Sequence, residues 1–217
     1  MEEYKGYKLY FEDEKYKKIL EGVVDKKFEV EKEYKKEGKT YVAKIKCQNK
    51  SYILKQFFIK KKFKKFLSIF KEGESVKTFK SIEIISKKIP ELVKIYGAGI
   101  KRKGIFIEEE FILMEYVEGR VIDEDKFYRK ILEMIEKIHK IGRYHGDCNP
   151  GNFLFDGDGK IYIIDTKVKK MLFGNYRAHY DVLTLFKYFN TKPEYPYKQD
   201  IFYKIAYMVR QYRNKKR

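Results

Sequence analysis

The chain has few of the residues that stabilise small secreted domains or bind structural zinc. Its 217 residues contain two cysteines, three histidines and no tryptophan. Cys47 and Cys148 fall in different predicted elements, so the sequence offers no disulfide framework and favours a reducing compartment. A zinc site is not expected, because cysteines and histidines do not cluster. Although Cys148 stands beside Asp147, we interpret it as a buried, unreactive thiol and not as a nucleophile.

Long apolar stretches are also missing from the sequence. No segment approaches the roughly 20 apolar residues that a transmembrane helix needs, and the acidic start lacks the apolar core of a signal peptide. We therefore expect a soluble, cytoplasmic protein. Hydrophobic residues make up 43% of the chain, which is enough to bury a core in one large domain or in two small lobes.

Acidic residues are too few to balance the basic ones, and the formal net charge is +18 at pH 7. This charge predicts attraction to an anionic partner, such as nucleic acid, a membrane face rich in acidic lipid, or a phosphorylated acceptor. The excess is mostly lysine and the chain shows no nucleic-acid-binding module, so we expect no specific nucleic-acid partner.

The most informative segment is the loop 145–152, which is followed by the apolar run 161–164. Asp147, Asn152 and Asp165 stand five and then thirteen residues apart, with a Gly/Pro turn between the first two and a predicted hairpin before the third. This spacing matches the H-x-D-x-x-x-x-N loop and the metal-binding Asp of protein-kinase-like enzymes. One carboxylate can orient and deprotonate an acceptor hydroxyl. The amide oxygen and the second carboxylate can bind Mg²⁺ on the phosphates of ATP.

Two features earlier in the chain fit the same chemistry. Lys55 lies in a β-like run, Ser51–Phe58, where kinase-like enzymes carry the lysine that binds the α- and β-phosphates. A helix predicted over Ser75–Lys88 would bring a glutamate to this lysine. Glu83 is the preferred residue and Glu74 is the alternative.

An apolar strand that passes into a polar linker, Phe111–Gly119, is typical of the hinge that receives adenine. The backbone of Glu115, Tyr116 and Val117 is expected to bind the base. We also expect His145 to brace the catalytic loop by hydrogen bonding and not to perform chemistry.

These elements predict an α+β, bilobal protein-kinase-like fold. Residues 1–116 would form an amino-terminal lobe built on an antiparallel sheet, and residues 117–217 a small, mostly helical carboxy-terminal lobe that carries the catalytic loop. Strands are predicted at 28–34, 40–47, 51–58, 92–99 and 105–116, and a buried helix ends at Gly142.

The chain departs from protein kinases in three places. A single glycine, Gly38, stands where a full glycine-rich loop is usual, and Asp165-Thr166-Lys167 replaces the D-F-G triplet. Only sixteen positions lead from Asp165 to Asp181, so the long activation segment that holds a peptide substrate is missing. Asp181 is expected to open a helix, either as a buried support for the catalytic loop or as a plain amino-terminal cap.

The segment 59–70 carries aromatic and aliphatic residues at helical spacing, with lysines on its other flank. It predicts an amphipathic basic helix. Such a helix could face the core with its lysines in solvent, or it could rest on anionic lipid or a phosphorylated substrate.

Taken in order, these motifs resemble the bacterial lipopolysaccharide core heptose kinases, a family within the protein-kinase-like superfamily. The resemblance runs from about Lys39 to Phe186 and depends on the residues around Lys55, on the hinge strand and on the loop that ends at Asn152. It implies transfer of the γ-phosphate of ATP, with Mg²⁺, to a heptose hydroxyl at the cytoplasmic face of the inner membrane.

By the same resemblance, the acceptor would be an anionic sugar or glycolipid, reached through a peripheral contact with the membrane. Two other functions stay open at this point. One is an atypical serine/threonine protein kinase with a short activation segment, and the other is a non-catalytic kinase-like nucleotide-binding module.

Overall fold

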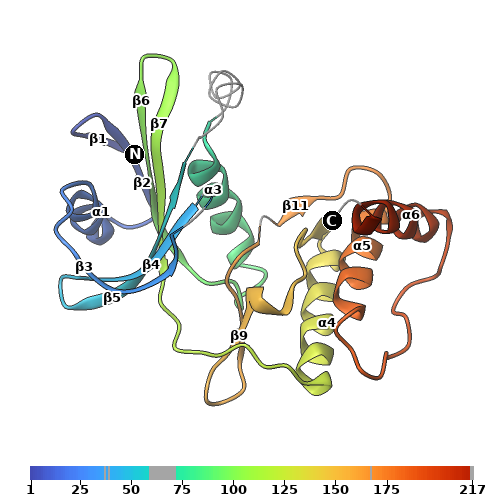
Figure 1. Cartoon of the computed structure of the whole chain (residues 1–217). Helices are drawn as coiled ribbons and strands as arrows, with labels where there is room; N and C mark the ends of the chain where they lie inside the picture. The colour runs from blue at the N-terminus through green and yellow to red at the C-terminus, as the bar shows by residue number, and fades with distance from the viewer. Residues whose placement is uncertain (37, 39, 59–71, 167, 216–217) are drawn as a thin grey trace. The chain divides into compact units, whose positions relative to one another are not determined.

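The structure is a computed structural model that describes residues 1–36, 38, 40–58, 72–166 and 168–215. The chain divides into two compact units. The first contains Met1–Lys87 and Val93–Tyr116, and the second contains Lys88–Leu92 and Val117–Arg217. The predicted α+β class is confirmed, because a large antiparallel sheet dominates the first unit and helices dominate the second (Figure 1). The short crossing of 88–92 into the second unit was not predicted.

The first unit is built on a seven-stranded sheet with the order β1-β2-β6-β7-β5-β4-β3. Every neighbouring pair in it is antiparallel. Four of the five predicted strands are confirmed to within one residue at each end, and the strand predicted at 92–99 is present as β6, displaced by three to four residues. No bounds were predicted for β1 and β2. The strands are β1 (Glu2–Tyr4), β2 (Tyr7–Phe11), β3 (Glu29–Lys35), β4 (Thr40–Cys47), β5 (Lys50–Phe57), β6 (Ile95–Lys103) and β7 (Phe106–Glu115).

Alternation along β5 decides which side chains enter the core of this unit. Tyr52 and Leu54 are buried, whereas Lys55 points to the opposite face because successive side chains of a strand alternate. The core cluster also takes residues from helix α1 (Lys17–Val24), which follows the short helix η1 (Glu14–Tyr16). Sequence reasoning missed α1, whose buried residues include Leu20.

Helix α3 (Glu74–Ser86) packs against β6 and β7 and corresponds to the helix predicted over 75–88. It begins after Gly73, whose φ of 102° favours glycine. The carboxylate of Glu110, on β7, accepts hydrogen bonds from the backbone N–H of Ser75 at 3.0 Å and from its hydroxyl at 3.1 Å. A buried glutamate from the sheet therefore caps this helix, and burial raises the pKa of Glu110.

The second unit contains three helices that pack in sequence order, together with several short strands (Figure 1). The predicted hairpin is present as the antiparallel pair β9 and β10, and β8 pairs with β11. Its elements are α4 (Asp125–Lys140), β8 (Arg143–Tyr144), η2 (Pro150–Asn152), β9 (Phe153–Phe155), β10 (Ile161–Ile163), β11 (Lys169–Lys170), α5 (Tyr176–Phe186) and α6 (Ile201–Lys215).

Asp181 does not open a helix, so the prediction that it could be a plain cap is wrong. Helix α5 begins at Tyr176 and its N-cap residue is Asn175. Asp181 lies inside the helix with 1% of its surface exposed. The apolar residues after Asp181 were recognised, but the polar and aromatic first turn of α5 gave no periodic signal.

The amphipathic helix predicted over 59–70 lies outside the described residues, as does Lys167 of the Asp-Thr-Lys triplet. Within the described part of the chain, no helix is long and apolar enough to cross a membrane.

Candidate active site

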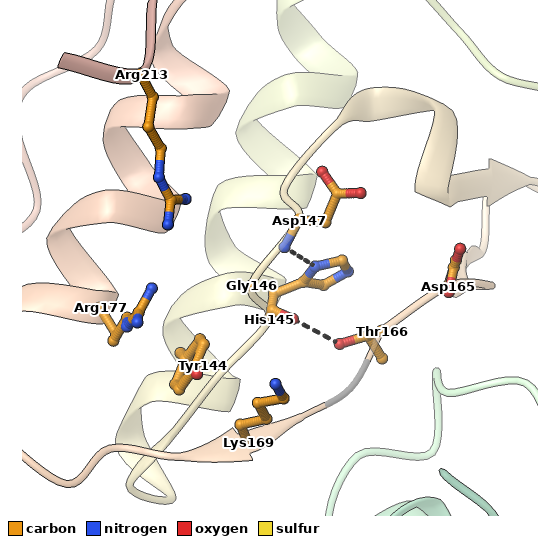
Figure 2. Close-up of a pocket in the computed structure, with 9 residues that line it drawn as sticks. All are labelled: Tyr144, His145, Gly146, Asp147, Asp165, Thr166, Lys169, Arg177 and Arg213. Atoms are coloured by element: carbon orange, nitrogen blue, oxygen red, sulfur yellow. Dashed lines mark hydrogen bonds between the residues drawn. The ribbon is translucent and has the colours of Figure 1, made fainter. Parts of the chain in front are cut away.

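The catalytic-loop residues of the sequence prediction meet in the second unit. Asp147 and Asp165 line one pocket of about 350 Å³ (Figure 2). The side-chain amide of Asn152 donates a hydrogen bond to the backbone carbonyl of Asp147 at 2.8 Å. The structure therefore brings together all three oxygen-bearing residues that the spacing singled out.

The carboxylate of Asp181 supports the backbone of the loop 145–152. This carboxylate accepts hydrogen bonds from the N–H of His145 at 2.7 Å and from the N–H of Gly146 at 3.0 Å. It also lies 3.2 Å from Nε2 of His139. The predicted support of the loop by Asp181 is confirmed. Because both donors are backbone groups next to Asp147, this carboxylate sets where the loop passes.

The backbone conformation at residue 146 explains why a glycine stands between His145 and Asp147. The φ of Gly146 is 88°, in the left-handed region that side chains rarely adopt. A Cβ at this position would also lie 3.3 Å from the ring of Tyr144. Glycine thus lets the chain turn sharply while its N–H reaches Asp181.

His145 is a structural brace, as predicted. Only 1% of its surface is exposed, and its ring stacks on Phe153 with centroids 5.1 Å apart. Its Nδ1 accepts a hydrogen bond from the N–H of Asp147 at 3.2 Å, and its carbonyl accepts one from the hydroxyl of Thr166 at 3.2 Å (Figure 2). Burial lowers the pKa of His145, which favours the neutral ring that this acceptor role requires.

Cys148 is fully buried, and burial raises the pKa of its thiol well above the ordinary range. A thiol held in its neutral form is a poor nucleophile. This agrees with the interpretation of Cys148 as a packing residue.

The hairpin β9–β10 connects the two candidate metal ligands. Phe153, directly after Asn152, pairs with Ile163, and the N–H of Ile164 donates to the carbonyl of Asn152 at 3.0 Å. Asp165 follows at once. These backbone hydrogen bonds therefore hold Asn152 and Asp165 close together, although the two residues stand thirteen positions apart in sequence.

The donor set of this loop fits Mg²⁺. Since the amide nitrogen of Asn152 donates to the backbone, its oxygen is the end that can bind a cation, and Asp165 adds an exposed carboxylate. Mg²⁺ is usually held by one or two carboxylates together with phosphate oxygens and water. The described residues contain no group of three or more His, Cys, Asp or Glu that could hold a metal.

The predicted nucleotide-binding residues belong mainly to the first unit. Lys55 pairs in register with Val42 of β4 and with Ile112 of β7. Glu83 and Glu74 both lie on α3. Nine residues of helix place them about half a turn apart around the axis, so at most one of them can face a given partner. The pairing of Lys55 with Glu83 stays a prediction.

The predicted hinge residues follow β7. Glu115 ends the strand, and its N–H donates to the carbonyl of Lys94 at 2.9 Å. The ammonium of Lys44 lies 4.1 Å from the ring centroid of Tyr116. Tyr116 is the last residue of the first unit, and Val117 begins the longer segment of the second. Binding of adenine by these three residues stays a prediction.

Sequence reasoning missed three cations that line the pocket with Asp147. They are Lys169, Arg177 and Arg213 (Figure 2). The first two lie in the short stretch between Asp165 and Asp181, which was interpreted only as a missing activation segment. The positive charge of these two residues could have revealed them in the sequence. No sequence signal pointed to Arg213, because it comes from α6, a helix that was not predicted.

Comparison with known proteins adds a family to this geometry. The family model of the lipopolysaccharide kinase (Kdo/WaaP) family matches residues 23–207. The chain belongs to this family. Its members are kinases, so the chain is an ATP-dependent phosphotransferase with the bilobal, protein-kinase-like α+β fold that the motifs predicted.

Individual relatives agree with this placement. The chain is similar to the lipopolysaccharide core heptose(II) kinase WaaY of Escherichia coli, with 28% identity over 76% of each chain. Shorter similarities reach protein kinases. CBL-interacting protein kinase 8 of Oryza sativa is 31% identical over 35% of this chain and 19% of its own length. The probable serine/threonine-protein kinase ndrC of Dictyostelium discoideum is 41% identical over 22% of this chain and 4% of its own.

Proposed function

We propose that this member of the lipopolysaccharide kinase family transfers the γ-phosphate of ATP to a heptose hydroxyl of the lipopolysaccharide inner core. The observation that carries the proposal is the shared pocket of Asp147 and Asp165, on a loop whose backbone Asp181 holds. The name of the Escherichia coli relative, a core heptose(II) kinase, supports a heptose as the sugar.

Asp147 orients the acceptor hydroxyl and takes its proton. Its backbone is fixed from both sides, by His145 through the N–H and by Asn152 through the carbonyl. A carboxylate whose backbone is held by hydrogen bonds at both its N–H and its carbonyl suits a reaction in which positioning supplies most of the rate enhancement.

Asn152 and Asp165 bind Mg²⁺, which neutralises charge on the transferred phosphoryl group when it is bound. Lys55, oriented by Glu83, binds the α- and β-phosphates. The backbone of Glu115, Tyr116 and Val117 receives the adenine. These roles follow from the positions of the residues in the kinase motifs.

We further propose that the protein works in the cytoplasm, in peripheral contact with the inner face of the cell membrane. Leu172 and Phe173 are 79% and 75% exposed, and only Met171 separates them in sequence from the two lysines of β11, Lys169 and Lys170. Exposed apolar side chains next to lysines are typical of surfaces that rest on anionic lipid. Such a contact would bring the pocket to a lipid-anchored acceptor.

A second candidate, an atypical serine/threonine protein kinase, is favoured by the short similarities to protein kinases. The short stretch of sequence between Asp165 and Asp181 weighs against a protein kinase. This stretch contains only two-residue β11 and the first turn of α5 among its regular elements in the described part, so it offers little platform for a peptide.

The test is to incubate the purified protein with γ-labelled ATP, Mg²⁺ and two lipopolysaccharide preparations, one with and one without core phosphate, together with a mixture of peptides and casein. The proposal expects label in the lipopolysaccharide, with mass spectrometry locating one added phosphate on a heptose. An Asp147→Asn variant controls for contaminating kinases. Label confined to peptide or protein would support the protein kinase instead, and ATP binding without any transfer would contradict both.

A further inference from the structure

The pocket beside Asp147 has a strongly basic wall that the phosphotransfer chemistry does not use. We infer that Lys169, Arg177 and Arg213 bind an oxyanion already present on the acceptor, either a phosphate monoester or the carboxylate of an acidic core sugar. This inference rests on the proposed function, and it names the feature of the acceptor that this enzyme recognises.

The three cations come from three elements of the second unit. Lys169 lies on β11, in register with Tyr144 of β8. Arg177 lies in the first turn of α5, and Arg213 lies on α6, which packs against α5. Residues far apart in sequence thus converge on one pocket.

Tyrosine rings hold both arginines in place. The guanidinium carbon of Arg177 lies 5.4 Å from the ring centroid of Tyr144 and 4.7 Å from that of Tyr176. The guanidinium carbon of Arg213 lies 5.2 Å from the ring centroid of Tyr180, and its Nη1 donates to the hydroxyl of Tyr180 at 3.1 Å. Arginines stacked in this way are pre-organised and keep several N–H donors for an anion.

No ion pair joins a carboxylate to any of these three cations within the described part of the chain. The acids that line the pocket are Asp147 and Asp165, which the proposed mechanism uses for the hydroxyl and for Mg²⁺. Three like charges around one pocket repel each other. A bound oxyanion would remove this repulsion, and guanidinium groups match phosphate and carboxylate oxygens in a two-pronged geometry.

The position of the cations favours the acceptor over ATP as the source of the anion. Figure 2 shows Arg177 and Arg213 on one side of the backbone of residues 145–147 and the metal-ligand candidate Asp165 on the other. Asp147 lines the same pocket as both groups. An acceptor bound on the basic side would therefore present a hydroxyl to Asp147 while its own charged substituent contacts the arginines.

The first test measures transfer to two acceptors, a core lipopolysaccharide that carries phosphate and the same material after hydrofluoric acid has removed the phosphate. The variants are Arg177→Gln, Arg213→Gln and the double substitution. Arg129→Gln is the charge-matched control, because Arg129 is exposed on α4 and does not line the pocket. A far-ultraviolet spectrum and a melting temperature equal to those of the wild type will show that all four variants fold normally.

Loss of one charge-assisted contact is expected to raise KM for the acceptor about tenfold or more, since such contacts contribute on the order of 1.5–3 kcal/mol. KM for ATP should stay unchanged, and Arg129→Gln should match the wild type. If the effect appears only with the phosphorylated acceptor, the anion is a phosphate. If both acceptors are affected alike, it is a carboxylate. An unchanged acceptor KM in the double variant would overturn the inference and leave the proposed function intact.

The second test uses inorganic phosphate alone, titrated by calorimetry into protein saturated with a non-hydrolysable ATP analogue and Mg²⁺. Binding that the wild type and Arg129→Gln show and the double variant loses supports the basic wall as an oxyanion site. If this result came without transfer to any lipopolysaccharide, the acceptor assignment would fail while the oxyanion site stood. Equal phosphate binding by the wild type and the double variant would count against the site.

Discussion

Substitution of Asp181 should show how much of the active site depends on one buried carboxylate. In Asp181→Ala, the N–H groups of His145 and Gly146 lose their acceptor at a place where His145 is shielded from water. Hydrogen bonds to a charged group contribute about 1.5–3 kcal/mol each. Two of them predict a loss of about 3–6 kcal/mol from the free energy of unfolding, out of the roughly 5–15 kcal/mol that is usual for a domain.

Asp181→Asn separates stability from catalysis. Its amide oxygen can replace one carboxylate oxygen, but its NH₂ group would face the second backbone N–H. We expect roughly half of the stability loss of the alanine variant. Because Asp147 directly follows Gly146, we also expect kcat to fall by about a hundredfold, the usual cost of misplacing a catalytic group by an ångström.

Urea unfolding followed by circular dichroism measures the stabilities, and initial rates of phosphate transfer measure the catalytic effect. Asp158→Ala is the matched control, because Asp158 is exposed in the β9–β10 turn of the same unit. It should change the free energy of unfolding by no more than about 0.5 kcal/mol. An Asp181→Ala protein as stable and as active as the wild type would refute the assignment of Asp181 as the support of the loop.

Three further predictions concern other parts of the chain. Asp147→Asn should lower kcat by about 10²–10⁴-fold without weakening the binding of an ATP analogue, and parental turnover would contradict its role. Gly146→Ala should lower the free energy of unfolding by about 1–2 kcal/mol because of the positive φ at this residue; a wild-type urea midpoint would contradict this. Burial raises the pKa of Glu110 in the folded state, so its protonation stabilises the fold below the unfolded pKa, and this contribution is lost as pH rises through the folded pKa. The stability of the wild type relative to Glu110→Gln should therefore fall in urea titrations as pH rises above the ordinary pKa of glutamate, about 4.3, and a difference independent of pH would exclude the linkage.

Sequence patterns were sufficient for the parts of the molecule that depend on local order. A β-like run and an apolar run predicted the strands that carry Lys55 and lead into the predicted hinge, and a turn followed by a hairpin predicted the loop from Asp147 to Asp165. These features depend only on residues that are close in sequence and on backbone hydrogen bonds, so they can be recognised in a single sequence. Helix α1 was missed because the first part of the chain was interpreted as short strands, although Ile19, Leu20 and Val23 recur at helical spacing.

The spacing of Asp147, Asn152 and Asp165 was enough to predict a kinase-like phosphotransferase, and membership of the lipopolysaccharide kinase family confirms this class of enzyme. Tertiary structure alone decided which residues from distant parts of the sequence contact one another. Glu110 caps a helix that begins 36 residues earlier in the chain, and Arg213 reaches the pocket through the packing of α6 on α5. Such contacts depend on which surfaces meet when the chain folds, and no local pattern records them.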